Sequence, residues 1–181
     1  MPTFLARCRS RPRSLVALAA AIALMCAGGV AQASDAPVRE LQAKAAFLFN
    51  FARFVQWPAS TAPFVLGVAG DAALAAVVAA TVKGRTIDGR EVEVREVNPG
   101  DDPSGCHLLY FGQLAEVDAL ALLAQVRGST LTVGETPRFL RDGGMVRLFI
   151  EDQRLRFQVN RGRTAAAGLQ LSSQLLSLAA K

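Results

Sequence analysis

Apolar positions along the chain switch between helical and extended spacings, and this switching predicts a layered α/β fold. From Arg39 to Trp57 the apolar residues recur every three or four positions, as in a helix that ends before Pro58. Short apolar or alternating runs predict strands at 64–69, 91–97, 107–111 and 131–133. Helical spacing between these runs predicts helices at 72–80 and 114–126. Strands separated by helices favour a mainly parallel sheet covered on both faces.

The C-terminal part of the chain has a different pattern. Two apolar runs, 145–150 and 155–159, flank four polar residues and predict an antiparallel hairpin. A last helix is expected to begin after Asn160, a good cap residue, and to carry Leu171, Leu175 and Leu178 on one stripe. The expected fold is therefore a single-domain αβα layered sandwich with a mixed, mainly parallel sheet, ending in a hairpin and a helix.

The first predicted helix has two apolar stripes rather than one. The first stripe contains Leu41, Ala45, Leu48, Ala52 and Val55. The second contains Phe47, Phe51 and Phe54 and lies about 110° away at 100° per residue. Together they are wider than the ~100° that a surface helix needs for its own core. Two interpretations are open: the phenylalanine stripe is a partner or dimer interface, or both stripes are core.

The N-terminal segment has the three parts of a secretory signal peptide. Four arginines (Arg7, Arg9, Arg11 and Arg13) precede an apolar stretch from Leu15 to Ala27, and Ala31-Gln32-Ala33 follows as a cleavage motif. We expect residues 1–33 to be the signal peptide and residues 34–181 to be the mature periplasmic domain. An N-terminal anchor helix and a lipid-modified Cys26 are the alternatives.

The formal charge of +5 comes mostly from this signal segment. Without its four arginines, the 20 basic residues of the chain become 16, against 15 acidic ones. The mature chain therefore has no basic stripe of the kind that nucleic-acid binding needs.

The mature sequence predicts no convergent reactive set. Its one histidine, His107, follows Cys106 in a predicted strand, where neighbouring side chains point to opposite faces. The two residues therefore cannot act on one substrate or metal ion. We expect no enzymatic activity, no cofactor and no metal site. Cys106 is also the one cysteine beyond residue 33, which excludes an internal disulfide and leaves a buried thiol or an intermolecular bridge.

The segment from Lys44 to Pro58, KAAFLFNFARFVQWP, resembles the opening motif of the YfiR-like family of periplasmic proteins. Further blocks resemble later family motifs in the same order: Asp88-Gly89-Arg90, Cys106-His107-Leu108-Leu109, Gly143-Gly144-Met145, Phe157-Gln158-Val159-Asn160 and the segment 167–176. The resemblance covers about residues 40 to 178.

This resemblance implies a non-enzymatic periplasmic regulator with an αβα fold, often dimeric. The best-known member of the family represses an inner-membrane diguanylate cyclase by binding the periplasmic sensor domain of that enzyme. The implied partner is therefore a diguanylate cyclase or a sensor kinase, with a homodimer as a further assembly and no nucleic acid. A small-ligand sensor or carrier with a pocket at the strand ends is the main alternative. An enzyme that uses carboxylates is a more distant one.

Overall fold

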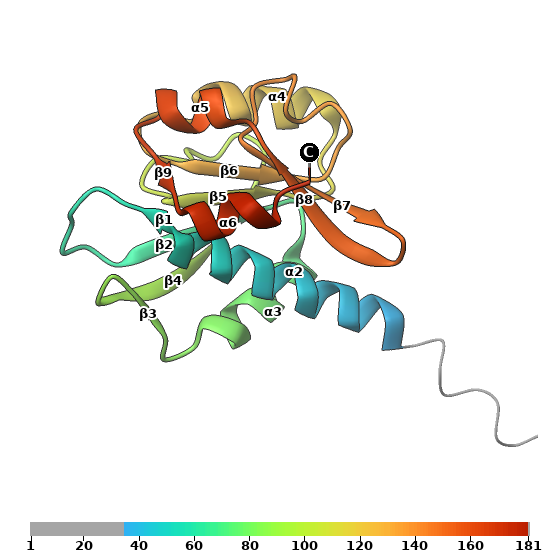
Figure 1. Cartoon of the computed structure of the whole chain (residues 1–181), viewed down its shortest axis with the longest axis horizontal. Coiled ribbons are helices and arrows are strands. Elements are labelled where there is room, and N and C mark those ends of the chain that lie inside the picture. The colour runs from blue at the N-terminus through green and yellow to red at the C-terminus, as the bar shows by residue number, and fades with distance from the viewer. Residues whose placement is uncertain (1–34, 181) are drawn as a thin grey trace, which may run out of the picture. The chain divides into compact units, whose positions relative to one another are not determined.

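The computed structural model describes residues 35–180, and its centre is a seven-stranded sheet (Figure 1). The predicted signal peptide, residues 1–33, lies outside the described residues. In spatial order the strands are β3 (Thr86–Ile87), β4 (Arg90–Val97), β2 (Phe64–Ala69), β5 (Leu108–Phe111), β6 (Leu131–Gly134), β7 (Val146–Glu151) and β8 (Arg154–Val159). A second sheet pairs β1 (Val55–Gln56) with β9 (Gln170–Leu171). The described helices are α2 (Asp35–Phe54), α3 (Ala72–Val82), α4 (Glu116–Gln125), α5 (Arg161–Ala166) and α6 (Ser173–Leu178).

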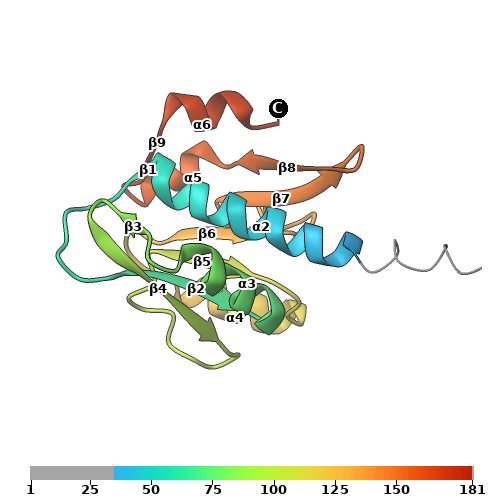
Figure 2. The ribbon, with the colours of Figure 1, turned by 90° about the horizontal axis from the view of Figure 1, so that it is seen from below.

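Helices cover both faces of the large sheet, which confirms the predicted αβα sandwich. Helices α2, α3 and α6 lie on one face, and α4 and α5 lie on the other (Figures 1 and 2). The larger hydrophobic core is between the sheet and the first group, and includes Phe51 of α2, Leu74 of α3 and Leu175 of α6. A smaller core around Phe111, Leu122 and Phe139 lies under α4.

The strand order changes direction between β2 and β5. From β2 the chain crosses through α3 to the parallel strand β4, whereas from β5 it crosses through α4 to β6 on the other side. In open α/β sheets, ligands bind beyond the carboxyl ends of the strands near such a reversal. In this chain that place is where β2, β5 and β6 end, at Ala69, Phe111 and Gly134.

Local sequence signals account for several element boundaries. The side chain of Asp71 accepts a hydrogen bond from the Leu74 backbone N–H and caps α3, and Asn160 caps α5 through the Arg163 N–H. In the hairpin, Asp152 and Gln153 have φ of 49° and 60°, so the turn between β7 and β8 has two residues rather than the predicted four. The hairpin itself is confirmed.

The single C-terminal helix predicted after Asn160 is wrong. The chain forms α5, then the two-residue strand β9, then α6. Gly168 has φ of 72°, a left-handed conformation that a helix cannot continue through, and Ser172 starts α6 by accepting from the Leu175 N–H. The leucines at 171, 175 and 178 are therefore divided between β9 and α6 and do not form one helical stripe.

The first helix also ends earlier than its apolar pattern predicts. Helix α2 stops at Phe54, and Val55 and Gln56 pair with Leu171 and Gln170 in antiparallel register. The Ser172 N–H also donates to the Phe54 carbonyl over 2.9 Å. The helix end is thus set by residues more than 100 positions away, which no local pattern could reveal.

Candidate functional site at the carboxyl edge of the sheet

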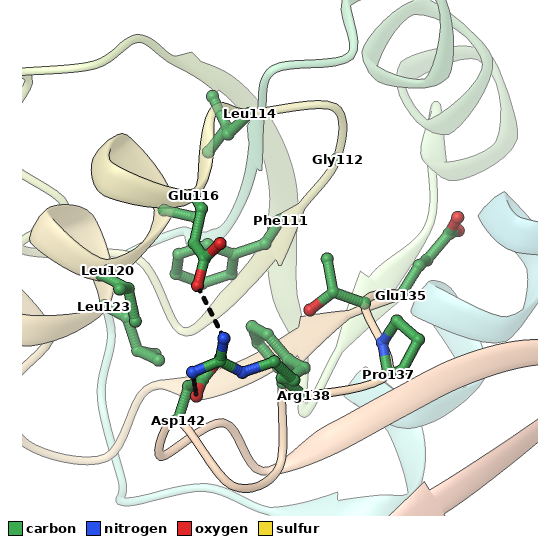
Figure 3. Close-up of a pocket in the computed structure, with 13 residues that line it drawn as sticks. Phe111, Gly112, Leu114, Glu116, Leu120, Leu123, Glu135, Pro137, Arg138 and Asp142 are labelled. Atoms are coloured by element: carbon green, nitrogen blue, oxygen red, sulfur yellow. Dashed lines mark ion pairs between the residues drawn. The ribbon is translucent and has the colours of Figure 1, made fainter.

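A cavity of about 270 Å³ lies between α4 and the connection from β6 to β7, at the carboxyl ends of β5 and β6 (Figure 3). We call it the α4 pocket. Its apolar wall is formed mainly by Phe111, Leu114, Leu120, Leu123, Pro137 and Phe139. The place fits the general rule for ligand sites in α/β sheets. The volume is near the lower end of the ~300–1,000 Å³ that is usual for small-molecule sites.

Two glycines hold the aromatic wall of the α4 pocket in place. A Cβ atom at Gly134 would lie 2.6 Å from the Phe139 ring, and a Cβ atom at Gly144 would overlap the same ring. The ring is therefore held between two stretches of backbone that only glycine allows to approach so closely. Phe139 also packs on Phe111, with ring centroids 5.3 Å apart. The second glycine of the Gly143-Gly144 pair thus serves packing of the pocket wall.

Charged side chains lie at the mouth of the α4 pocket (Figure 3). Arg138 Nη1 is 3.1 Å from Glu116 Oε1, and Arg138 Nη2 is 3.8 Å from Asp142 Oδ1. The Asp142 side chain is 19% exposed, whereas the other two are more than half exposed. Two carboxylates therefore share one guanidinium, which leaves one negative charge beside an apolar wall.

A polar cluster adjoins this pocket on the side of α2. Lys44 is buried, and its Nζ lies 2.8 Å from both Glu135 Oε1 and Glu40 Oε1. The buried Tyr110 hydroxyl donates to Glu135 Oε1 over 2.7 Å. Glu135 follows β6 directly and also lines the α4 pocket. One carboxylate thus connects the pocket, the sheet and α2.

The protonation states of this cluster follow from its geometry. Burial alone would lower the pKa of Lys44, but hydrogen bonds and charge from Glu135 and Glu40 outweigh it and raise that pKa. Burial and the Glu135 carboxylate strongly raise the pKa of the Tyr110 hydroxyl. Lys44 is therefore charged and Tyr110 neutral over the physiological range, so the cluster acts as a fixed ion pair with a hydrogen bond.

Neither Lys44 nor Glu135 is among the site residues that the sequence predicts. A signal was available for the first of them, because Lys44 continues the phenylalanine stripe backwards at helical spacing, three residues before Phe47. A lysine in line with an apolar stripe points to a buried partner. No such signal existed for Glu135, whose neighbours come from β5 and α2.

The three residues of the predicted interface stripe have different environments. Phe51 is fully buried, and its ring packs edge-to-face on Phe157, with centroids 5.0 Å apart. Phe47 and Phe54 are half-buried at the edge of the same core. At position 51 this placement agrees with the core interpretation. An interface role for Phe47 and Phe54 stays a prediction.

A groove between α2 and the hairpin lies near that stripe and has both charged and apolar residues in its lining. It has a volume of about 320 Å³ and is lined by Lys44, Ile150 and Leu155, among others. The Phe47 ring packs on Phe157 of the hairpin at 6.0 Å, and Ile150 is 57% exposed. We call Phe47, Ile150 and Leu155 the α2–hairpin surface.

Residues from three of the family-like motifs meet at the opposite edge of the sheet, where the parallel strands begin. Trp57 packs edge-to-face on Phe64, with centroids 5.0 Å apart, and His107 stacks on the same ring at 4.8 Å. The guanidinium of the buried Arg90 lies 5.2 Å from the Phe64 centroid. These four residues form the Trp57 cluster, which shows that the motifs assemble the amino edge of the sheet.

Both ring nitrogens of His107 face N–H donors. The Val65 backbone N–H lies 3.1 Å from Nδ1, and Arg90 Nη1 lies 3.0 Å from Nε2. A neutral imidazole can accept a hydrogen bond through one ring nitrogen, whereas a protonated imidazole can accept none, so these N–H donors favour the neutral form. Burial, with the charge of Arg90, accordingly lowers the pKa of His107. The imidazole lies just before β5, and its partners come from the neighbouring strands β2 and β4.

Cys106 is a buried free thiol, which agrees with the first of the two predicted states. Burial raises the pKa of the Cys106 thiol, although Arg95 Nη2 lies 2.9 Å from its sulfur and opposes that shift.

Within residues 35–180, no three His, Cys, Asp or Glu side chains lie close enough to hold a metal ion. In the same range, no helix has the length and apolar character needed to cross a membrane.

Comparison with known proteins gives one result for nearly the whole described chain. Residues 41–180 match the profile of the family described as YfiR/HmsC-like. No curated protein matches the chain. The matched range contains every strand of the described residues, the Trp57 cluster and the α4 pocket, and it agrees with the range of the motif resemblance. The chain therefore belongs to the YfiR/HmsC-like family.

Proposed function

We propose that this chain is a non-enzymatic periplasmic regulator that binds the periplasmic sensor domain of an inner-membrane signalling enzyme and represses that enzyme. A diguanylate cyclase is the first candidate partner, and a sensor kinase is the second. Family membership over residues 41–180 is the observation that carries this proposal, because the YfiR/HmsC-like family is a periplasmic family of regulators.

The mechanism of repression is linkage between two conformations of the sensor domain. A protein that binds the inactive conformation more tightly lowers the active population by its preference between the two states. Such a regulator needs an accessible surface and no reactive groups. The neutral His107, held between two N–H donors, and the buried Cys106 fit a chain without nucleophilic chemistry.

The α2–hairpin surface is our candidate for the contact with the sensor domain. Phe47 packs on Phe157 of the hairpin, and Leu155 pairs across the hairpin with the exposed Ile150, so the half-buried Phe47 and Leu155 both lie against the hairpin side of α2. The phenylalanine stripe of α2 ends in this surface. Partner binding would bury these side chains and gain their transfer free energy from water.

Deletion of the gene tests the proposal in cells. Removal of a repressor should raise cyclic di-GMP and biofilm formation if the partner is a diguanylate cyclase. Periplasmic expression of residues 34–181 should restore the low level, whereas cytoplasmic expression should not, because the sensor domain faces the periplasm. Deleting the cyclase as well should erase the difference. Unchanged cyclic di-GMP in the single deletion would contradict the cyclase as partner.

A pair of arginine variants tests the surface. Ile150→Arg should leave the protein folded, weaken capture of the sensor domain and raise cyclic di-GMP. Val117→Arg is the matched control, because Val117 is 72% exposed on α4, on the other face of the sheet. An equal loss of capture in both variants, or none in either, would contradict the α2–hairpin surface.

The alternative function, a small-ligand sensor or carrier, is favoured by one observation, the α4 pocket at the carboxyl edge of the sheet. Failure of the mature protein to capture any membrane signalling protein would make this alternative the better one.

A further inference from the structure

The α4 pocket combines an apolar wall with a mouth of defined charge, and these two properties limit what it can bind. Its wall contains two phenylalanines and three leucines, with Phe139 held in place between Gly134 and Gly144. A cavity whose walls are positioned in advance loses little conformational entropy when a ligand enters. Its volume of about 270 Å³ suits a body of one ring with a short chain.

The mouth favours a positive charge on the ligand. Arg138, the cation among the residues that line this pocket, has one guanidinium nitrogen paired with Glu116 and the other directed at Asp142. An anion would have to displace a carboxylate from Arg138. A cation would instead balance the charge that the two carboxylates leave over.

Asp142 is the carboxylate best placed for this role. Its side chain is mostly buried, and its distance of 3.8 Å to Arg138 Nη2 is an ion pair without a hydrogen bond. A mostly buried carboxylate in this position gains more from a second cationic partner than a fully exposed one would, because solvent screens it less. The Glu135 carboxylate, at the other end of the pocket, already has the Lys44 ammonium and the Tyr110 hydroxyl as partners.

We propose that the α4 pocket is a binding site for a small organic cation, an amine with an apolar body about the size of one ring. The hydrocarbon part lies against Phe111, Phe139 and the leucines of α4, and the ammonium group lies between Asp142 and Glu116. This inference goes beyond the repressor function and does not depend on it, because the pocket and the α2–hairpin surface are on different faces of the sheet.

Calorimetric titration of the purified protein with three probes of equal body tests the charge. The probes are 2-phenylethylamine, 2-phenylethanol and 3-phenylpropanoate. We expect the amine to bind saturably and about tenfold more tightly than the alcohol, and the carboxylate to show no binding. Equal affinity of amine and alcohol, tighter binding of the carboxylate, or no saturable binding of the amine would each overturn the proposal.

Variants place the amine in the pocket. Asp142→Asn combined with Glu116→Gln should lower the affinity for the amine to that for the alcohol. Glu151→Gln is the matched control, because Glu151 pairs with Arg156 at 3.4 Å on the distant hairpin. Ala119→Leu fills the pocket and should abolish binding of both probes, whereas Ala121→Leu, on the exposed side of α4, should not. Unchanged affinity in the double variant or in Ala119→Leu would overturn the proposal.

Discussion

The two faces of the large sheet are covered to very different extents. On the side of α2, helix α3 buries Leu74, Ala75, Val78 and Val82, and three helices contribute to one continuous core. On the other side, α4 buries Leu122 alone, leaving Val117 72% and Leu120 41% exposed. The first face supplies most of the stabilising burial, whereas the second keeps a cavity open at the carboxyl edge.

This difference indicates how one small domain can be stable and still present a binding site. A closed core makes a strong contribution to stability, but it has no room for a ligand. A face with less buried apolar area opens more easily, and binding sites are generally found in such regions. The α4 face can leave room for a ligand because the larger core on the α2 face supplies most of the buried apolar area that stabilises the domain.

The largest expected effect is the loss of a core ring on the closed face. Phe51→Ala should lower the free energy of unfolding by about 3–5 kcal/mol, since it leaves a cavity between α2 and Phe157. Leu122→Ala on the α4 face should cost less, about 2 kcal/mol, because its surroundings can relax into the open pocket. Urea denaturation of both variants measures the two values. A greater loss from Leu122→Ala would reverse the comparison.

The next effect concerns the glycine that touches the pocket wall. Gly144→Ala should destabilise the protein by about 1–3 kcal/mol, because the new methyl group overlaps the Phe139 ring. Gly162→Ala is the control, because a Cβ atom added at Gly162 would lie 3.6 Å from its nearest neighbour, Asn160 Oδ1. Gly162 is in helix α5, where alanine is favoured over glycine by about 0.5–1 kcal/mol. Thermal melts of both variants give the comparison. A neutral Gly144→Ala would show that Phe139 can move.

His107 provides a pH test of the amino edge. The pKa of His107 in the folded protein lies below the ordinary 6.5. Below about pH 6.5 the unfolded chain therefore binds more protons at His107 than the folded chain does. Stability should therefore fall as the pH is lowered from 7.5 to 5.5. His107→Gln should flatten this dependence, because His107 is the one histidine of the chain. Equal slopes in the two proteins, measured by urea denaturation at each pH, would contradict the lowered pKa.

The smallest effect is expected at the mouth of the α4 pocket. Glu116→Gln removes an ion pair whose side chains are 67% and 60% exposed, so stability should change by less than about 1 kcal/mol. Glu151→Gln, which breaks the exposed pair with Arg156, should behave alike. A loss of several kcal/mol from Glu116→Gln alone would mean that the mouth is part of the structural core and does not belong to an open site.

Much of the fold could be predicted because its signals are local. The strand at 64–69 agrees with β2 residue for residue, and Asp71 caps α3, which follows that strand and turn. The motif from Lys44 to Pro58 was sufficient, with the later blocks, to indicate the family that residues 41–180 match. Hydrophobic period, cap residues and short motifs act within a few positions of the chain, so the sequence by itself determined the layers, the hairpin and the family.

Tertiary structure alone decided the helix ends and the candidate site. Pairing of Val55 with Leu171 ended α2 against its local helical pattern, and it formed β9 in the expected C-terminal helix, which Gly168 also interrupts. The α4 pocket is lined by residues of β5, α4 and the connection after β6. Glu135 pairs with Lys44, which is 91 positions away in the sequence. Such contacts depend on strand order and crossover geometry, and for that reason no spacing along the chain could disclose them.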